Sequence, residues 1–129
     1  MDETIISHMG LKLVIVDDAP FIREAIKTII QKTEHVIVGE ATNGVEAVAL
    51  ANKMQPDVVI MDLVMPEKNG IEATKEIMKI RPETKIIACS TVDEKKMIMQ
   101  AMEAGCTSYL TKPFEGHELI KIINKLEEQ

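Results

Sequence analysis

Acidic, hydroxyl and basic side chains stand where the short apolar runs of this chain end. In chain order they are Asp17, Asp18, Asp62, Ser90, Thr91 and Lys112. Three carboxylates held close together repel one another, and each resists ionisation unless a cation lies among them. Hard oxygen ligands on an open loop favour Mg²⁺, which binds through one or two carboxylates and keeps several waters. Metal ion, lysine and hydroxyl together would neutralise the oxygens of a phosphoryl group during its transfer.

Asp62 is the candidate nucleophile for such a transfer. It ends the apolar run of residues 58–61, which is rich in β-branched side chains and typical of a strand buried on both faces. Asp17 and Asp18 are adjacent and better placed to hold the metal. The alternative is that Asp62 only caps the end of its strand, which would be the better interpretation of a lone acid. The polar residues at the other strand ends favour the chemical role.

Five apolar runs alternate with five segments of helical periodicity. We predict strands over residues 11–16, 35–40, 57–62, 85–89 and 107–111, and helices over residues 20–30, 44–54, 71–80, 93–104 and 115–126. Asp93 is expected to cap the fourth helix and Gly105 to end it. Strict alternation requires a parallel sheet with right-handed crossovers and helices on both faces. The carboxyl ends of all five strands then share one edge of the sheet.

Composition excludes several classes of function. A length of 129 residues predicts one domain with its own core. The net charge of -6 argues against nucleic-acid binding by this chain alone. We find no apolar run of about 18 residues and no signal-peptide pattern, and therefore predict a cytoplasmic protein without membrane insertion. Neither G-x-G-x-x-G after the first strand nor G-x-x-x-x-G-K-[ST] occurs, so a nucleotide-binding function is weakly supported.

The ends and the cysteines need separate interpretation. Residues 1–10 show no periodicity and contain Ser7-His8-Met9, which is similar to a vector-derived scar, so we assign them to an N-terminal extension and the domain to residues 11–129. Cys89 and Cys106 lack metal-binding spacing and are interpreted as small buried apolar residues. The three histidines show no ligand spacing either, and we assign them no role.

The strand-end residues belong to a wider pattern. It consists of Asp17-Asp18, Asp62 followed by Met65-Pro66 and Gly70, then Ser90, Tyr109 and Lys112-Pro113-Phe114. Over residues 11–127 this pattern resembles the receiver domain of two-component response regulators. Segment 18–23 and the stand-alone length resemble the chemotaxis-type, CheY-like members. The resemblance implies a doubly wound, flavodoxin-like fold with a five-stranded parallel sheet in the order 2-1-3-4-5 and five helices.

The resemblance also implies a role for each site residue. Asp62 would accept a phosphoryl group from the phosphohistidine of a histidine kinase, and Lys112 would pair with a phosphoryl oxygen. Mg²⁺ would be held by Asp17, Asp18, Asp62 and the Val64 backbone carbonyl. Ser90 would move to bond another phosphoryl oxygen and Tyr109 would swing inward behind it, although Tyr109 alone would be read as a half-buried strand aromatic. We further predict a cis Lys112–Pro113 peptide, which would aim Lys112 at the acids.

We expect the face formed by the fourth helix, the fifth strand and the last helix to bind the downstream partner. The partner-binding candidates there are Ile98, Met102, Tyr109 and Ile122. The implied partners are the kinase, a downstream protein such as a flagellar motor switch protein, and a phosphatase. Ile122 has a simpler alternative role, as the edge of a wide buried helix face. By the same resemblance, the valines at positions 64 and 92 flank the path of a hydrolytic water.

Four alternatives remain open. The chain could be a phosphorelay intermediate or a receiver cut from a longer regulator. A phosphohydrolase with an aspartyl-phosphate intermediate would need a second Asp two residues after the nucleophile, where this chain has Val64. A receiver-shaped module that never takes phosphate is disfavoured by the complete set of site residues. We therefore predict a phospho-acceptor signalling domain that catalyses only its own phosphorylation and dephosphorylation, rather than an enzyme.

Overall fold

The computed structural model describes residues 10–91 and 93–129. Apart from Gly10, the predicted N-terminal extension lies outside the described residues. Strands and helices alternate strictly, as predicted. In chain order they are β1 (Lys12–Val16), α2 (Pro20–Ile30), β2 (Val36–Ala41), α3 (Gly44–Met54), β3 (Val58–Asp62), α4 (Gly70–Ile80), β4 (Lys85–Thr91), α5 (Lys95–Ala104), β5 (Ser108–Lys112) and α6 (Gly116–Glu127).

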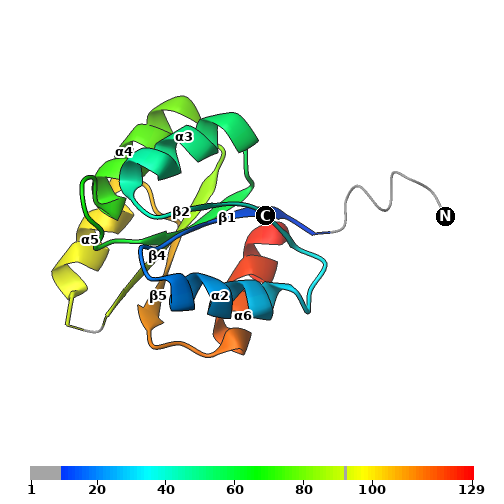
Figure 1. The fold of residues 1–129 in the computed structure, drawn as a ribbon. Coiled ribbons are helices and arrows are strands. Elements are labelled where there is room, and N and C mark those ends of the chain that lie inside the picture. The colour runs from blue at the N-terminus through cyan, green and yellow to red at the C-terminus, as the bar shows by residue number, and fades with distance from the viewer. Residues whose placement is uncertain (1–9, 92) are drawn as a thin grey trace.

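The five strands form one parallel sheet in the order β2-β1-β3-β4-β5, which confirms the predicted fold class. Helices α2 and α6 cover one face, and α3, α4 and α5 cover the other (Figure 1). The register pairs Asp62 with Cys89 and Thr91 with Lys112. The polar ends of β3, β4 and β5 therefore lie side by side at one edge.

Two apolar layers hold the sheet in place. Side chains such as Val14, Val59 and Ala88 pack under α3, α4 and α5, while Leu13 and Ile60 face α2 and α6. All five residues of β3 are buried, because this strand lies at the centre of the sheet and is covered on both faces. The position of Asp62 is thus fixed by the most deeply packed strand of the fold.

Both cysteines are free thiols buried within these layers, in agreement with the sequence analysis. Burial raises the pKa of the Cys89 thiol to about 12 and also raises the pKa of Cys106. Both thiols are therefore protonated at neutral pH, and neither is a nucleophile.

The predicted cap of α5 was wrong. The helix begins at Lys95, its N-cap is Glu94, and the Glu94 carbonyl accepts the first helical hydrogen bond from the Ile98 N–H at 3.1 Å. The Asp93 carboxylate instead accepts a 2.6 Å hydrogen bond from the Thr91 hydroxyl. Strand β4 also extends through Thr91, beyond the predicted end at residue 89, because its last residues pair with β5. Gly105 ends α5 as predicted, with a φ of 126° that favours glycine.

His35 joins three elements at the opposite end of the sheet. Its Nδ1 accepts a hydrogen bond from the Leu11 N–H, at 2.9 Å, so its Nε2 carries the proton and donates to Asn124 Oδ1, also at 2.9 Å. His35 therefore ties the start of β1 and β2 to α6. It is a structural residue that the sequence analysis did not identify.

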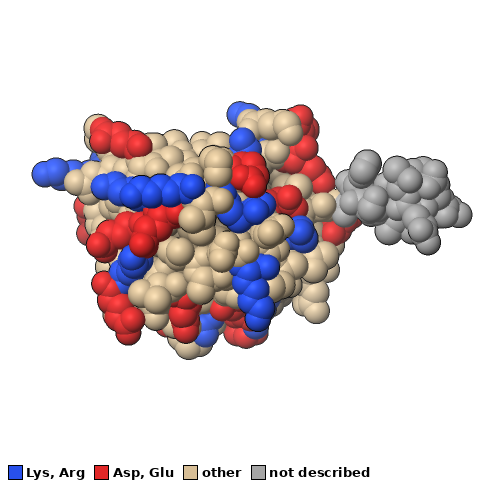
Figure 2. Space-filling model, turned by 90° about the horizontal axis from the view of Figure 1, so that it is seen from above, with Lys and Arg blue, Asp and Glu red and all other residues tan. Residues whose placement is uncertain are grey.

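The surface of the described residues carries charges of both signs. On the face over α3 and α4, basic and acidic side chains are interspersed, without a large area of one sign (Figure 2). Within residues 10–91 and 93–129, every helix is too short or too polar to span a lipid bilayer.

Candidate functional site

Three carboxylates converge at the carboxyl edge of the sheet, as the strand ends predicted. Asp17 and Asp18 directly follow β1, and Asp62 is the last residue of the neighbouring strand β3. One oxygen from each carboxylate lies within 4.8 Å of the other two. Asp17 and Asp62 are buried, whereas Asp18 is exposed to solvent. The cluster therefore has a protein-facing side and one side open to water.

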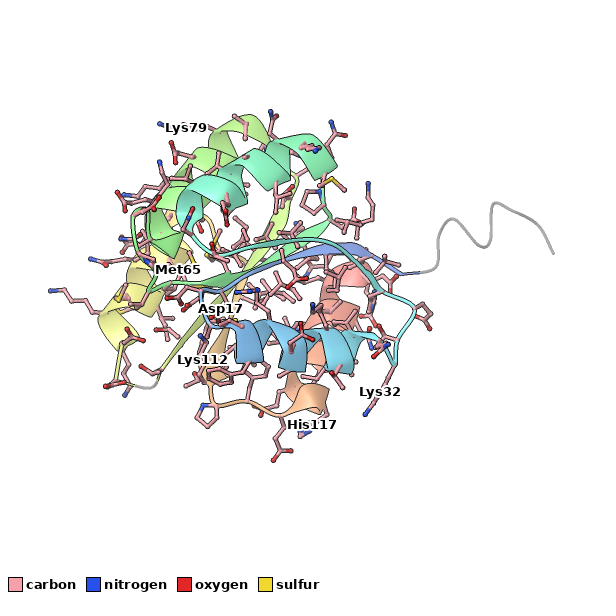
Figure 3. The ribbon with its side chains drawn as sticks, in the orientation of Figure 1. Asp17, Lys32, Met65, Lys79, Lys112 and His117 are labelled. Atoms are coloured by element: carbon pink, nitrogen blue, oxygen red, sulfur yellow. The ribbon has the colours of Figure 1, made fainter. Side chains whose placement is uncertain are left out.

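Lys112 brings the positive charge of the site. Its Nζ lies 2.8 Å from Asp17 Oδ2 and 3.4 Å from Asp62 Oδ1. Figure 3 shows Asp17 and Lys112 together at this end of the sheet. The Lys112–Pro113 peptide is cis, as predicted. Burial acts to lower the pKa of Lys112, but its hydrogen bond to Asp17 and the charges of Asp62 and Asp17 outweigh burial and leave that pKa raised. Lys112 is thus a permanent cation at neutral pH.

Asp17 is held in place from several sides. Its Oδ1 accepts a hydrogen bond from the Ala19 N–H at 2.9 Å, and its backbone carbonyl accepts one from Arg23 Nη1 at 2.7 Å. Because Oδ2 faces Lys112, both carboxylate oxygens of Asp17 already have partners. Asp17 therefore acts as a fixed negative charge beside Asp62.

Asp62 is undercompensated, meaning that the nearby positive charge of Lys112 only partly offsets the effects of burial and of the Asp17 charge. Its pKa is raised from 3.8 to about 6, mainly by burial and then by the charge of Asp17. The Lys112 charge and a 3.3 Å hydrogen bond from the Val64 N–H act in the opposite direction without cancelling the rise. A further cation in the cluster would lower this pKa and favour the ionised carboxylate.

The donor set fits a hard divalent cation. All three side chains offer carboxylate oxygens, which suit Mg²⁺ better than the nitrogen and sulfur ligands that zinc sites prefer. The exposed Asp18 leaves room for the waters that Mg²⁺ retains. Gly70 allows the following loop to fold against β3, since a Cβ there would collide with the Asp62 carbonyl oxygen.

Ser90 lies buried at the end of β4, and its hydroxyl is engaged by a residue that sequence reasoning missed. The hydroxyl donates to Glu94 Oε1 at 2.6 Å, and the Thr91 N–H donates to the same oxygen at 3.0 Å. The hydrogen bond from Ser90, followed by those from Thr91, lowers the pKa of Glu94. A carboxylate four residues after the hydroxyl was the one sequence signal that could have identified Glu94.

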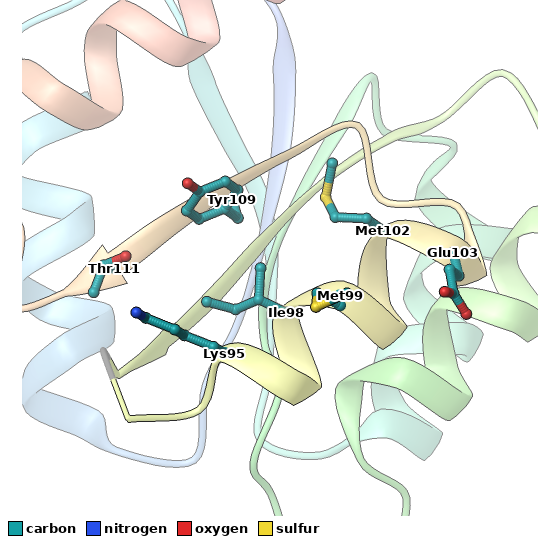
Figure 4. Close-up of a pocket in the computed structure, with 7 residues that line it drawn as sticks. All are labelled: Lys95, Ile98, Met99, Met102, Glu103, Tyr109 and Thr111. Atoms are coloured by element: carbon teal, nitrogen blue, oxygen red, sulfur yellow. The ribbon is translucent and has the colours of Figure 1, made fainter.

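Three of the four predicted partner-binding residues line one groove. Ile98 and Met102 come from α5 and Tyr109 from β5, and together they border a hollow of about 610 Å³ (Figure 4). Tyr109 is 53% exposed, so its ring occupies an outward position. Ile122 does not line this groove; it is partly buried against the core and lines an adjoining hollow together with Met102 and Tyr109.

Comparisons with known proteins agree on one family. The sequence model of the response regulator receiver domain matches residues 13–124. The chemotaxis protein CheY of Thermotoga maritima is 47% identical over 118 residues, which cover 92% of this chain and 98% of that protein. The response regulator domain of Thermotoga maritima CheB superposes with a TM-score of 0.85 at 33% identity, covering 93% of this chain and 98% of that one. The receiver domain of the Pseudomonas aeruginosa sensor histidine kinase PA1611, solved with magnesium in its active-site cleft, gives a TM-score of 0.85 at 25% identity, with coverages of 93% and 99%.

Proposed function

Because the chain belongs to the response regulator receiver domain family, we propose that it is the phospho-acceptor of a two-component system and that Asp62 accepts the phosphoryl group. The observation that carries this proposal is the undercompensated Asp62 carboxylate, 3.4 Å from Lys112 and clustered with Asp17 and Asp18. It combines a nucleophile, a cation and further oxygen ligands at one edge of the sheet.

In the proposed reaction, a carboxylate oxygen of Asp62 attacks the phosphorus of a kinase phosphohistidine. The new O–P bond forms as the P–N bond breaks, and the electron pair of that bond returns to the imidazole. Lys112 would neutralise one phosphoryl oxygen and the Ser90 hydroxyl would donate to another. Mg²⁺ held by Asp17, Asp18, Asp62 and the Val64 carbonyl would supply further positive charge to the phosphoryl oxygens.

Phosphorylation would switch the groove between α5 and β5. Ser90 moves toward the phosphoryl group, and Tyr109 turns inward from its exposed position, which changes the shape of the groove lined by Ile98 and Met102. Ile122 contributes from the neighbouring hollow. The switch needs no new element, because the phosphoryl contacts only shift the balance between two arrangements of the same residues.

A role in chemotaxis is supported by the 47% identity to CheY over nearly all of that protein. The proposed partners are a histidine kinase as donor, a flagellar motor switch protein as target and a phosphatase that ends the signal. The proposed receiver domain spans residues 11–129, and the proposed location is the cytoplasm, where these partners would meet it.

Incubation with Mg²⁺ and acetyl phosphate, followed by intact-mass measurement, tests the proposal. We expect wild type to gain one phosphoryl group and Asp62→Asn to gain none. Asp57→Asn is the matched control, because Asp57 is an exposed acid just before the same strand, where it accepts a hydrogen bond from the Lys12 N–H. Turnover of generic phosphate esters without a stable adduct would instead indicate a phosphohydrolase, and neither adduct nor turnover a binding module.

A further inference from the structure

Several donors converge on one oxygen beside the proposed phosphoryl site. Glu94 Oε1 lies 2.6 Å from the Ser90 hydroxyl, 3.0 Å from the Thr91 N–H and 2.7 Å from the Thr91 hydroxyl. A serine hydroxyl has a single proton, so Ser90 can donate either to Glu94 or to a phosphoryl oxygen, but not to both. In this structure that proton is directed at Glu94.

The competing hydrogen bond is a strong one. Ser90 is only 2% exposed, so water cannot readily replace Glu94 as its acceptor. Hydrogen bonds to an ionised carboxylate are short and about twice as strong as those between neutral groups. The lowered pKa of Glu94 means that the carboxylate is ionised at neutral pH, when the bond is at full strength.

We propose that Glu94 is a positioning residue that holds Ser90 in the resting state, and that a phosphoryl group on Asp62 must displace it to obtain the Ser90 hydrogen bond. This inference rests on the proposed function, since it concerns the response of Ser90 to phosphorylation. Glu94 keeps the Thr91 N–H as a donor after Ser90 leaves, and the Thr91 hydroxyl, which has one proton to share between Asp93 and Glu94, can then turn to Glu94 as well. The release therefore does not leave the Glu94 carboxylate without a hydrogen-bond donor. Glu94 thereby sets the balance between resting and active populations.

The same residue connects the site to the groove. Glu94 is the N-cap of α5, and its backbone carbonyl accepts the hydrogen bond of Ile98, one of the groove residues. Figure 4 shows Lys95 and Ile98 projecting from the first turns of α5 toward β5. Displacement of the Glu94 side chain from Ser90 therefore acts on the turn from which the groove helix starts.

Beryllofluoride, a stable mimic of the phosphoryl group, gives the direct test in the presence of Mg²⁺. We expect Glu94→Ala to bind it more tightly than wild type by roughly tenfold, the factor that corresponds to about 1.4 kcal/mol. Glu94→Gln keeps an acceptor oxygen without the charge, so its affinity should lie between the two. Wild-type affinity, or weaker binding, in both variants overturns the proposal.

Asp93→Asn is the control for charge. It removes one negative charge from the same turn, but Asp93 bonds Thr91 and not Ser90. Its effect should stay within about twofold, as is usual for an exposed charge. An Asp93→Asn effect as large as that of Glu94→Gln would show that general repulsion, and not the hold on Ser90, is responsible.

A double-mutant cycle with Ser90→Ala tests whether Glu94 acts through the hydroxyl. In the Ser90→Ala background, Glu94→Gln should change beryllofluoride affinity no more than Asp93→Asn does. If Glu94→Gln changes beryllofluoride affinity as much in the Ser90→Ala background as it does in wild type, the proposal is overturned. If wild type takes neither beryllofluoride nor phosphate from acetyl phosphate, the proposed function itself fails, whereas normal phosphorylation with unaltered Glu94 variants removes only this inference.

Discussion

The Lys112 ammonium forms a 2.8 Å ion pair with Asp17, whose side chain is almost fully buried. Its distance to Asp62 is longer, at 3.4 Å. The single cation Lys112 thus lies between two buried acids and stabilises the Asp62 carboxylate less than that of Asp17. The negative charge of Asp17 further disfavours ionisation of Asp62. The metal-free site is therefore short of positive charge, which has measurable consequences for stability.

Asp62→Asn should stabilise the metal-free protein at neutral pH. The pKa of Asp62 is raised from 3.8 to about 6, so between these values the folded state binds more protons than the unfolded state. Stability therefore falls as the pH rises through this window, and the full cost of ionising Asp62 is present above it. Allowing for partial solvent screening, we expect a gain of about 1 to 2 kcal/mol in the free energy of unfolding.

Urea unfolding in EDTA at pH 7.5 and at pH 4 measures this gain. The difference between Asp62→Asn and wild type should shrink at the lower pH, where the wild-type carboxyl is protonated. Asp57→Asn should show no gain, because it weakens the acceptor of the Lys12 N–H at the other end of the sheet. A loss of stability in Asp62→Asn at pH 7.5 would contradict the reading of the cluster as undercompensated.

Lys112→Met should destabilise the metal-free protein and make it more dependent on Mg²⁺. The substitution leaves Asp17 and Asp62 without their shared cation, a loss that costs roughly 2 to 3 kcal/mol for a largely buried pair. Mg²⁺ binding to the folded state should recover more stability in this variant than in wild type. Thermal unfolding with EDTA and with Mg²⁺ provides the comparison, with the exposed Lys121→Met as control. A Lys112→Met protein that is as stable as wild type in EDTA is incompatible with this account.

That the site residues lie close together was predictable, because the pattern of apolar residues in the sequence locates the strands. Apolar runs locate the strands, and strict alternation makes them parallel, so the residues that follow them must share an edge. Asp17, Asp62 and Lys112 reach the site by this route alone. Their relative distances were not predictable, because they depend on the register between β1, β3, β4 and β5.

The cap of α5 and the role of His35 depend on side-chain contacts that produce no periodic pattern in the sequence. By residue type Asp93 is the better N-cap, yet its carboxylate accepts a hydrogen bond from Thr91 and the helix starts one residue later, with Glu94 as N-cap. His35 is buried because Leu11 and Asn124, which are distant in the sequence, supply its two partners. Pairings between residues this far apart require the assembled fold.

Ile98→Asp should weaken binding of the proposed partner, a flagellar motor switch protein, to the phosphorylated form. Ile98 lines the groove with Met102 and Tyr109, and a carboxylate there would have to be desolvated when a partner docks. We expect at least a tenfold loss, or about 1.4 kcal/mol, with phosphorylation by acetyl phosphate unchanged. Val45→Asp is the matched control, since Val45 is 51% exposed on α3, away from the groove. Equal losses in both variants, or none in Ile98→Asp, would place the output surface elsewhere.

The phosphorylated form should be long-lived, because an apolar side chain borders the approach to Asp62. Hydrolysis requires a water in line with the bond from Asp62 to phosphorus. Val64 follows Asp62 by two residues, donates its N–H to Asp62 Oδ1 at 3.3 Å and is 49% exposed at the mouth of the site. A valine cannot orient a water and is stiff at χ1. The second valine that the sequence analysis placed on this path, at position 92, lies outside the described residues.

Val64→Asn should therefore speed dephosphorylation by about tenfold, the effect of one water-orienting hydrogen bond of roughly 1 to 1.5 kcal/mol. Decay of the phosphorylated mass in Mg²⁺, after removal of acetyl phosphate, measures the rate. Val64→Leu, which stays apolar, should decay at the wild-type rate or more slowly, and Val92→Glu provides an independent polar substitution. If apolar side chains at positions 64 and 92 keep the water out, at least one polar variant must decay faster than wild type. Val64→Asn and Val92→Glu rates that both match or fall below the wild-type rate would rule out this shielding, because the water would then reach phosphorus without help from either position.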